Sequence, residues 1–582
     1  MHTRNAKILN KKFYEYIVPS ILSGIAVSLN EFVDSIIVAN LLGSEAMNAV
    51  SMGMPIMTLY AMIYLLFGAG GSALFAQCMG NLDRKGAGES LSVPLITAGA
   101  VSILFMAAGI FGADTAAGLL SGSAAAQQSF VRYVHVLLLS APLVIILQAL
   151  LMYLPSISSP RLGSTLNMLA NGINLVMDVV YIRVFGMDVE GAAWATFTGY
   201  SIAFIILIFL ILSGKCPLRI AIPEPKAFLR LKSIVMLSAA SALGQLGLSI
   251  KIAFSVQTAS AYGGAAAVTA FSACIQVLSI ISILVCAGLD VLRPLVGTLY
   301  GQKDFHGIRY IMKNVIRFEL VSMLVMVVLL QLFPQVVGMI YNVTDQETAA
   351  LCIEAVRIFS LMFICRSIVL VYMYYLQIIK QTVYSIAISV LDGFLGIIVL
   401  AAVFCTFFGL NGLWIAYAAL SVILMAAIII INHVKASTAA EPLDPMTLLE
   451  RTPSDYKFIE ATIHFDTDEM VSYVEELQKL SDDAGVQKLP ANLLAVSVEE
   501  MCDYVISHRD SLKYNEIDIL TQIYPDHAVI SFRSLGKPLD LMNAASAEEY
   551  SNLYVLKKLA SSVEYDYVLG MNQSRVTVMF GK

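Results

Sequence analysis

Long apolar segments alternate with short polar ones through the first 434 residues. A helix that crosses a membrane needs about 20 mostly apolar residues, and on this rule twelve segments qualify. They lie at residues 13–39, 51–79, 91–113, 131–153, 161–184, 190–213, 232–260, 267–297, 312–333, 354–379, 384–407 and 410–432. The pattern predicts an all-α polytopic membrane protein with twelve transmembrane helices.

The last part of the chain has a different pattern. Short β-prone runs alternate with segments that have helical periodicity and charged faces. The strands are expected at 460–465, 516–524, 528–534, 563–568 and 575–580, and the helices at 468–485, 491–508 and 547–562. This order predicts a small α+β domain in which helices cover a sheet.

Composition and charge support this division. The chain is 58% hydrophobic and 13% charged, whereas soluble domains have about 25% charged residues. Residues 441–582 hold 24 of the 42 acidic residues and 12 of the 36 basic ones. The basic start continues into an apolar segment too long for a signal peptide, so we expect the first helix to be retained.

The loops also differ in charge. Alternate loops hold all the loop Lys and Arg residues, among them Arg84, Lys85, Arg161, Lys303 and Lys380, and the loops between them hold none. Basic residues collect in cytoplasmic loops. The pattern therefore predicts that both termini are cytoplasmic.

Three sequence matches share one spacing. Residues 43–49 align with 264–270, residues 79–86 with 300–307 and residues 191–195 with 412–416, each with a shift of 221. Such a shift contains six spans, an even number, so the two repeats have the same orientation. The predicted divisions are a first six-helix bundle (1–212), a cytoplasmic loop (213–231), a second, parallel six-helix bundle (232–434), a linker (435–456) and the cytoplasmic α+β domain (457–582).

Polar residues within the spans are the first functional candidates, because ionisable groups are costly at membrane depth. Asn171, Asn174 and Asp178 occur at i, i+3 and i+7, which places them on one helical face. Glu31 and Asp34 form a second stripe, and the next helix after Asp178 offers two hydroxyls, Thr196 and Thr198. Such a cluster can bind a proton or a sodium ion. The structural alternative is interhelical hydrogen bonding, worth about 0.6 kcal/mol per bond.

The acids of the first half are missing from the second. With the shift of 221, Asp34 aligns with Ser255 and Asp178 with Val399, which favours a coupling site confined to the first bundle. The second half has charges of its own. Lys251 is an accessory candidate for the cavity, Asp290 and Arg293 are expected to form a structural ion pair, and Arg366 is expected to pair with a remaining acid. The eight cysteines have neither metal-ligand spacing nor a disulfide pattern, and we predict no metal site.

Three stretches carry a family resemblance. "VPSILSGIAVSLNEFVDSIIVANLLGSEAMNAVSMGMP", "GAGGSALFAQCMGNLDRKGAG" and "TLNMLANGINLVMDVVYIRVFGMDVEGAAWATFTG" resemble the first, second and fifth-to-sixth helix regions of MATE (multidrug and toxic compound extrusion) transporters. The resemblance covers about residues 10–435. It implies antiport, in which a cationic or amphipathic compound leaves as protons or sodium ions enter. It also implies that Asp34, Asn174, Asp178 and Thr196 form the cation-coupling site. Glu31, Asn171 and Thr198 are accessory candidates because of their positions in the polar spans.

The tail resembles the ATP-binding domain shared by anti-sigma-factor serine kinases and histidine kinases. "LLAVSVEEMCDYVISH" resembles the N-box helix, with Glu499 in place and Asp503 where the magnesium-binding Asn is expected. "RSLGKPLD" resembles the adenine-reading strand and loop, which here contains Gly536, but Ser534 occupies the position of the acid. Tyr550 and Asn552 replace glycines of the lid. These losses argue against binding of ATP or magnesium, and no cofactor is predicted.

Three functional classes follow from these features. The first is a proton- or sodium-coupled antiporter for organic cations in the plasma membrane, with a cytoplasmic regulatory or partner-binding domain and no enzymatic activity. The second is a lipid-linked saccharide flippase, which would need several basic residues in its cavity. The third is a membrane-anchored ATP-binding signalling protein, which the lost nucleotide motifs disfavour. Small organic cations and the lipid bilayer are the expected partners, and no nucleic acid is expected.

Overall fold

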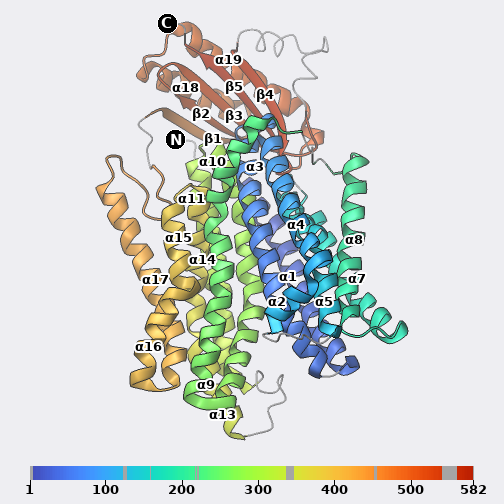
Figure 1. The fold of residues 1–582 in the computed structure, drawn as a ribbon. Helices are drawn as coiled ribbons and strands as arrows, with labels where there is room; N and C mark the ends of the chain where they lie inside the picture. The colour runs from blue at the N-terminus through green and yellow to red at the C-terminus, as the bar shows by residue number, and fades with distance from the viewer. Residues whose placement is uncertain are drawn as a thin grey trace.

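The fold is known from a computed structural model, in which the helices form one elongated body and a β-sheet lies across one end of it (Figure 1). The structure describes residues 4–42, 44–121, 128–157, 159–216, 218, 222–335, 346–450, 455–539 and 560–580. Between residues 31 and 48 it describes the side chains of Val33, Ile37 and Leu42 only.

The described residues of the first half of the helical part form eight α-helices. They are α1 (Lys7–Leu42), α2 (Ser44–Tyr64), α3 (Gly70–Gly80), α4 (Arg84–Ser121), α5 (Gln128–Leu139), α6 (Ala141–Leu151), α7 (Pro160–Val179) and α8 (Glu190–Leu212). Two π-helical turns, η1 (Leu65–Ala69) and η3 (Val180–Val184), continue α2 into α3 and extend α7, and a 3₁₀ turn, η2 (Leu154–Ile157), follows α6.

The second half repeats this plan. Its helices are α9 (Arg230–Val291), α10 (Gly297–Gly301), α11 (Phe305–Leu332), α13 (Gln346–Ser360), α14 (Met362–Ile378), α15 (Thr382–Val390), α16 (Gly396–Phe408) and α17 (Asn411–Thr438). The π turns η5 (Leu292–Val296) and η6 (Leu391–Leu395) join α9 to α10 and α15 to α16, and the 3₁₀ turn η4 (Pro225–Leu229) precedes α9.

The helices are long and apolar enough to make this a multi-pass membrane protein. Among the described residues eight helices could each cross a membrane, or ten if the bent pairs α5–α6 and α13–α14 each count as one span. One of the eight, Pro225–Gly301, has 77 residues and would be about 115 Å long if straight. It is broken at Gly264 (φ 61°, ψ −152°), a conformation that favours glycine. The expected spans at 232–260 and 267–297 lie on either side of this break, and the total of twelve stays a prediction.

The C-terminal region contains a five-stranded antiparallel sheet. Its strands are β1 (Lys457–His464), β2 (Glu516–Ile523), β3 (His527–Leu535), β4 (Ser562–Val568) and β5 (Met571–Met579), in the spatial order β1-β2-β3-β5-β4. The helices α18 (Thr467–Asp483) and α19 (Lys488–Ser507), with the 3₁₀ turn η7 (Arg509–Ser511), lie between β1 and β2. All five expected strands and the first two expected helices are present. The expected helix at 547–562 falls almost wholly outside the described residues.

Period-two patterning gives this sheet two different faces. Apolar side chains such as Ile519, Ile530 and Val576 pack with α18 and α19 in one buried core. The alternate positions are polar and face the end of the helical part, among them Glu460, Asp518, Arg533, Gln573 and Arg575. This polar face of the sheet is therefore an interface with the helical part (Figure 1).

Candidate functional site

A polar stripe runs along α7. Asn167, Asn171, Asn174 and Asp178 follow one another at intervals of four, three and four residues, so they share one face of the helix. Asn171 and Asn174 are 9% and 8% exposed and Asp178 is fully buried. The predicted orientation of this stripe toward the bundle interior is confirmed.

Asn174 connects three helices. Its amide nitrogen donates to the hydroxyl of Thr196 on α8 over 3.3 Å, and its amide oxygen accepts from Asn30 on α1 over 3.3 Å. Gly199 on α8 allows this approach, because a Cβ atom there would collide with the carbonyl oxygen of Ala170 on α7. The close packing of α7 on α8 thus brings Asn174 and Thr196 together, as predicted.

The accessory candidates have local partners. Asn171 donates to the carbonyl oxygen of Asn167, one turn earlier on α7, over 2.8 Å. Thr198 contacts the hydroxyl of Tyr181 over 2.9 Å and donates to the carbonyl oxygen of Trp194. Asp34 and Glu31 lie on α1, but their side chains are outside the described residues. Their predicted place in the site stays a prediction.

Several residues of this hydrogen-bond network were not predicted from the sequence. Gln148 on α6 donates to Asn167 over 3.4 Å and to the hydroxyl of Tyr200 over 3.1 Å. Asn167 donates to the hydroxyl of Ser23 on α1 over 3.5 Å. Asn167 could have been found, because it continues the periodicity of the stripe by one turn. Gln148 and Tyr200 are isolated polar residues in apolar segments, and only the packing of the helices brings them together.

The stripe begins at a cavity of about 420 Å³ between the two halves of the helical part. The lining comes from α1, the α6–α7 region and the end of α9, and Asn167, Gln148 and Ser23 belong to both the cavity and the network. Asp290 contributes a carboxylate whose side chain is 47% exposed, and it accepts a hydrogen bond from Ser20 over 2.5 Å. The cavity therefore gives solvent access to one end of a buried polar path that leads toward Asp178.

The intramembrane charges of the second half form a separate cluster. Lys251 on α9 donates to the backbone carbonyl of Asp392 over 2.8 Å and lies 4.9 Å from the ring centroid of Tyr417. Arg366 reaches the other side of the Asp392 carboxylate at 3.5 Å. The predicted pairing of Arg366 with an acid is thus confirmed. Lys251 is only 3% exposed and does not line the cavity, contrary to its choice as a cavity candidate, because Asp392 and Tyr417 hold it inside the second half.

Asp290 and Arg293 form the predicted ion pair, at 3.6 Å. Arg293 also stacks on the ring of Tyr374, 5.2 Å from its centroid, and its side chain is only 13% exposed. Asp290 is the more accessible of the two and faces the cavity. The pair therefore has a place in the cavity wall that its spacing in the sequence did not reveal.

The nucleotide motif residues of the C-terminal domain are spread over the sheet and one helix. Glu499 is half-buried and Asp503 is exposed, one turn apart on α19, and Ser534 is buried near the end of β3. Gly536 accepts a hydrogen bond from the hydroxyl of Tyr567 over 2.9 Å through its carbonyl oxygen. The lid positions Tyr550 and Asn552 lie outside the described residues. No group of three or more His, Cys, Asp or Glu that could hold a metal ion occurs among the residues that the structure describes.

Comparison with known proteins points to one class of membrane protein. Residues 19–180 match the family model MatE. The helical part has the fold of solved MATE transporters: an outward-facing multidrug resistance MATE transporter of the MOP superfamily is 20% identical with a TM-score of 0.64, and covers 73% of this chain and 96% of its own. A MOP superfamily transporter from Pyrococcus furiosus, whose binding pocket is described as having reversed polarity, is 19% identical with the same TM-score, and covers 73% of this chain and 97% of its own.

Curated relatives match this chain over part of its length. The DNA damage-inducible protein F of Escherichia coli is 28% identical over 190 residues, which are 32% of this chain and 41% of that protein. The multidrug export protein MepA of Staphylococcus aureus is 25% identical over 185 residues, 31% of this chain and 41% of MepA. The chain thus spans about two fifths of the length of these relatives. The family model thus matches residues 19–180, and the solved transporters share the fold of the helical part.

Proposed function

We propose that the protein is a secondary active transporter that exports cationic or amphipathic organic compounds in exchange for protons or sodium ions. The observation that carries this proposal is the buried stripe on α7, in which Asn174 bridges α1 and α8 one turn before the fully buried Asp178. The matches to multidrug exporters and the MATE fold support the same function. By family resemblance and loop charge, the protein resides in the plasma membrane with both termini in the cytoplasm.

In this mechanism Asp178 is the ion-binding carboxylate, and Asn174, Thr196 and Asp34 complete its site. Binding and release of the ion at this buried carboxylate change the charge inside the first bundle. Because α1 contributes Asn30 to the hydrogen-bond network and Ser23 to the cavity wall, this change reaches the cargo site through α1. Pro19 lies inside α1, and a helix bends most readily at proline.

The cavity lining weighs against a lipid-linked saccharide flippase. A pyrophosphate-carrying lipid calls for several basic residues, and Arg293 is the one Lys or Arg among the described residues of this cavity wall. Its guanidinium is already paired with Asp290 and Tyr374. An organic cation would instead meet the half-exposed carboxylate of Asp290.

We further propose that the C-terminal domain regulates transport, does not hydrolyse ATP and offers a surface for a cytoplasmic protein partner. The substitutions at the nucleotide motifs support the absence of ATP chemistry. The contacts of its sheet with the helical part support a regulatory role.

The test is uptake of a fluorescent organic cation into everted vesicles under an imposed proton or sodium gradient. We expect Asp178→Asn to reduce gradient-driven uptake to the level of vesicles without the protein, because an amide cannot take up a proton or carry the charge that binds sodium. Asp188→Asn is the matched control, since Asp188 is exposed in the loop before α8. Gradient-driven uptake that survives in Asp178→Asn would assign this acid a structural role only.

A further inference from the structure

The two halves of the helical part meet in a seam with internal symmetry. Gly80 at the end of α3 packs on the carbonyl oxygen of Thr298, and Gly301 at the end of α10 packs on the carbonyl oxygen of Gln77, so closely that a Cβ atom at either glycine would collide. Gly80 and Gly301 differ by 221 positions, and so do Gln77 and Thr298. The two halves therefore make the same contact twice, once from each side.

The loops that follow α3 and α10 also have the same conformation. Leu82 and Lys303 occupy equivalent positions and both have positive φ angles, 58° and 56°. In each loop the aspartate one residue later accepts a hydrogen bond from the backbone of a glycine at the next helix start, Asp83 from Gly86 and Asp304 from Gly307, both over 2.8 Å. We refer to residues 80–84 and 301–305 as the paired loops.

Strand β5 of the C-terminal sheet contacts both paired loops. The guanidinium of Arg575 donates to the carbonyl oxygens of Gly80 and Asn81, over 3.1 and 2.9 Å. Gln573 accepts from the side chain of Gln302 over 2.6 Å. Because Gln573 and Arg575 are two residues apart, they lie on the same face of the strand. One strand thus contacts the first half with one side chain and the second half with the other.

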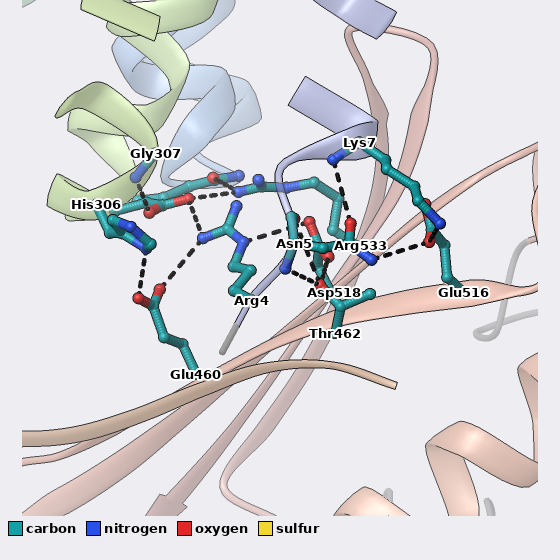
Figure 2. Close-up of polar contacts among 12 residues, drawn as sticks. Arg4, Asn5, Lys7, His306, Gly307, Glu460, Thr462, Glu516, Asp518 and Arg533 are labelled. Carbon is teal, nitrogen blue, oxygen red and sulfur yellow. Dashed lines mark hydrogen bonds and ion pairs between the residues drawn. The ribbon is translucent and has the colours of Figure 1, made fainter. Parts of the chain in front are cut away.

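A buried cluster of charges fastens the sheet to the second loop. Asp304 accepts from Arg4, near the chain start, over 2.8 Å and from Arg533 on β3 over 3.0 Å. Arg4 also contacts Asp518 on β2 at 3.3 Å and Glu460 on β1 at 3.5 Å. Figure 2 shows Arg4 between the sheet and the helices, with its guanidinium directed at these acids. The chain start, the second loop and three strands are therefore joined at one point.

The first loop has a second attachment. Arg84 donates to the carboxylate of Asp566 and to the carbonyl oxygen of Tyr565, both over 3.1 Å. Both residues belong to β4, the edge strand of the sheet. Its side chain is 64% exposed, so this contact adds less than the buried ones. The sheet nevertheless holds each paired loop through at least two side chains.

We propose that the C-terminal sheet is a clamp that keeps the two bundles closed against each other at this end of the protein. Opening a path between the bundles here requires α3 and α10 to separate, and the polar face of the sheet bridges the loops at their ends. The sheet must therefore release one paired loop before the seam opens. The clamp gives the proposed regulatory role a physical form, and only its effect on transport rests on the proposed function.

Amide hydrogen exchange of the full-length protein tests the clamp without reference to transport. Arg575→Ala removes the charged hydrogen bonds to the first loop while leaving the apolar core of the domain intact, because Arg575 faces away from α18 and α19. Loss of such bonds corresponds to roughly a tenfold or greater change in an opening equilibrium. We expect exchange to rise by about that factor in both segments 76–84 and 297–305, although Arg575 contacts only the first.

Arg509→Ala serves as the matched control, since Arg509 is exposed in η7 on the same domain, and it should leave both segments unchanged. Gln573→Ala, which removes the contact with the second loop, should reproduce the effect of Arg575→Ala. Faster exchange in the directly contacted loop alone, or in neither loop, would overturn the clamp. If opening at this end limits the rate of transport, Arg575→Ala and Gln573→Ala should take up the cation faster than the native protein. If neither the native protein nor any variant takes up the cation, but amide exchange rises as expected, the transport proposal is rejected and the clamp proposal stands.

Discussion

At the scale of single residues, Asp304 joins the helical part to the sheet through two arginines, Arg4 and Arg533. Its carboxylate is fully buried, which alone would raise its pKa, but the positive charges of Arg4 and Arg533 lower the pKa below its ordinary value. The backbone N–H of Gly307 donates to the same carboxylate. Asp304 therefore stays charged at every physiological pH, and its contacts are permanent features of the docked domain.

Removing this charge should undock the sheet from the second loop. Asp304→Asn leaves Arg4 and Arg533 buried next to a neutral amide, and breaking a buried pair in this way costs about 3–5 kcal/mol. We expect faster proteolysis of the linker at 435–456 and faster exchange at residues 301–307. Asp510→Asn, at an exposed position in the same domain, should change neither. Unaltered proteolysis of Asp304→Asn would show that the charge cluster does not hold the domain.

The pH dependence of docking follows from the lowered pKa of Asp304. A carboxylate with a lowered pKa stabilises the docked state above its ordinary pKa of about 4, and this stabilisation is lost only as the pH falls through the lowered value. The protection factors of residues 301–305 should therefore be constant between pH 5 and 8. His306 pairs with Glu460 at 2.5 Å in the same interface, so the measurement is repeated with His306→Gln. A loss of protection above pH 5 that persists in this variant would contradict the assignment.

At the scale of elements, the seam depends on the absence of side chains at two helix ends. Gly80→Ala places a methyl group against the backbone of Thr298, which cannot move aside as a flexible side chain would. We expect a loss of about 1–3 kcal/mol in stability, measured as a lower melting temperature of the purified protein. Gly172→Ala is the control, because nothing lies within 4 Å of a Cβ atom at this helical position. There alanine should be neutral or stabilise by up to about 1 kcal/mol. Equal melting temperatures for the two variants would mean that the seam is not tightly packed.

The same scale shows what periodicity can predict. The stripe on α7 followed from spacing alone, because three polar residues at i, i+3 and i+7 must share a face of any helix. The break at Gly264 and the π turns did not follow, since they depend on how neighbouring helices pack. Gln148 and Tyr200 were not predicted for the same reason. An isolated polar residue shows no periodicity, and only the fold brings α6 next to α7 and α8.

At the scale of the whole molecule, the sequence predicted both parts but not how they meet. The 221-residue shift predicted two repeated halves, and β-prone runs predicted the five strands. The sequence did not show that the polar face of the sheet meets the helical part, because Glu460, Asp518 and Arg533 are residues that usually remain hydrated. Their partners Arg4 and Asp304 lie more than 150 residues away, and no local pattern connects them. The place of Lys251 in the second half was harder to predict. A lysine within an apolar span can line a cavity or belong to a buried ion cluster, and Lys251 belongs to such a cluster.

The docked domain should not respond to ATP. Ser534 stands where the resemblance expects the adenine-reading acid, and Asp503 stands where it expects the magnesium-binding Asn, so neither the base nor the metal would find its usual partner. Titration of the full-length protein with ATP and magnesium should give no saturable heat, with any Kd weaker than about 1 mM, or −4.1 kcal/mol. Exchange at α19 and at the paired loops should be the same with and without the nucleotide. Saturable binding accompanied by faster exchange at residues 76–84 and 297–305 would instead make ATP the ligand that opens the clamp.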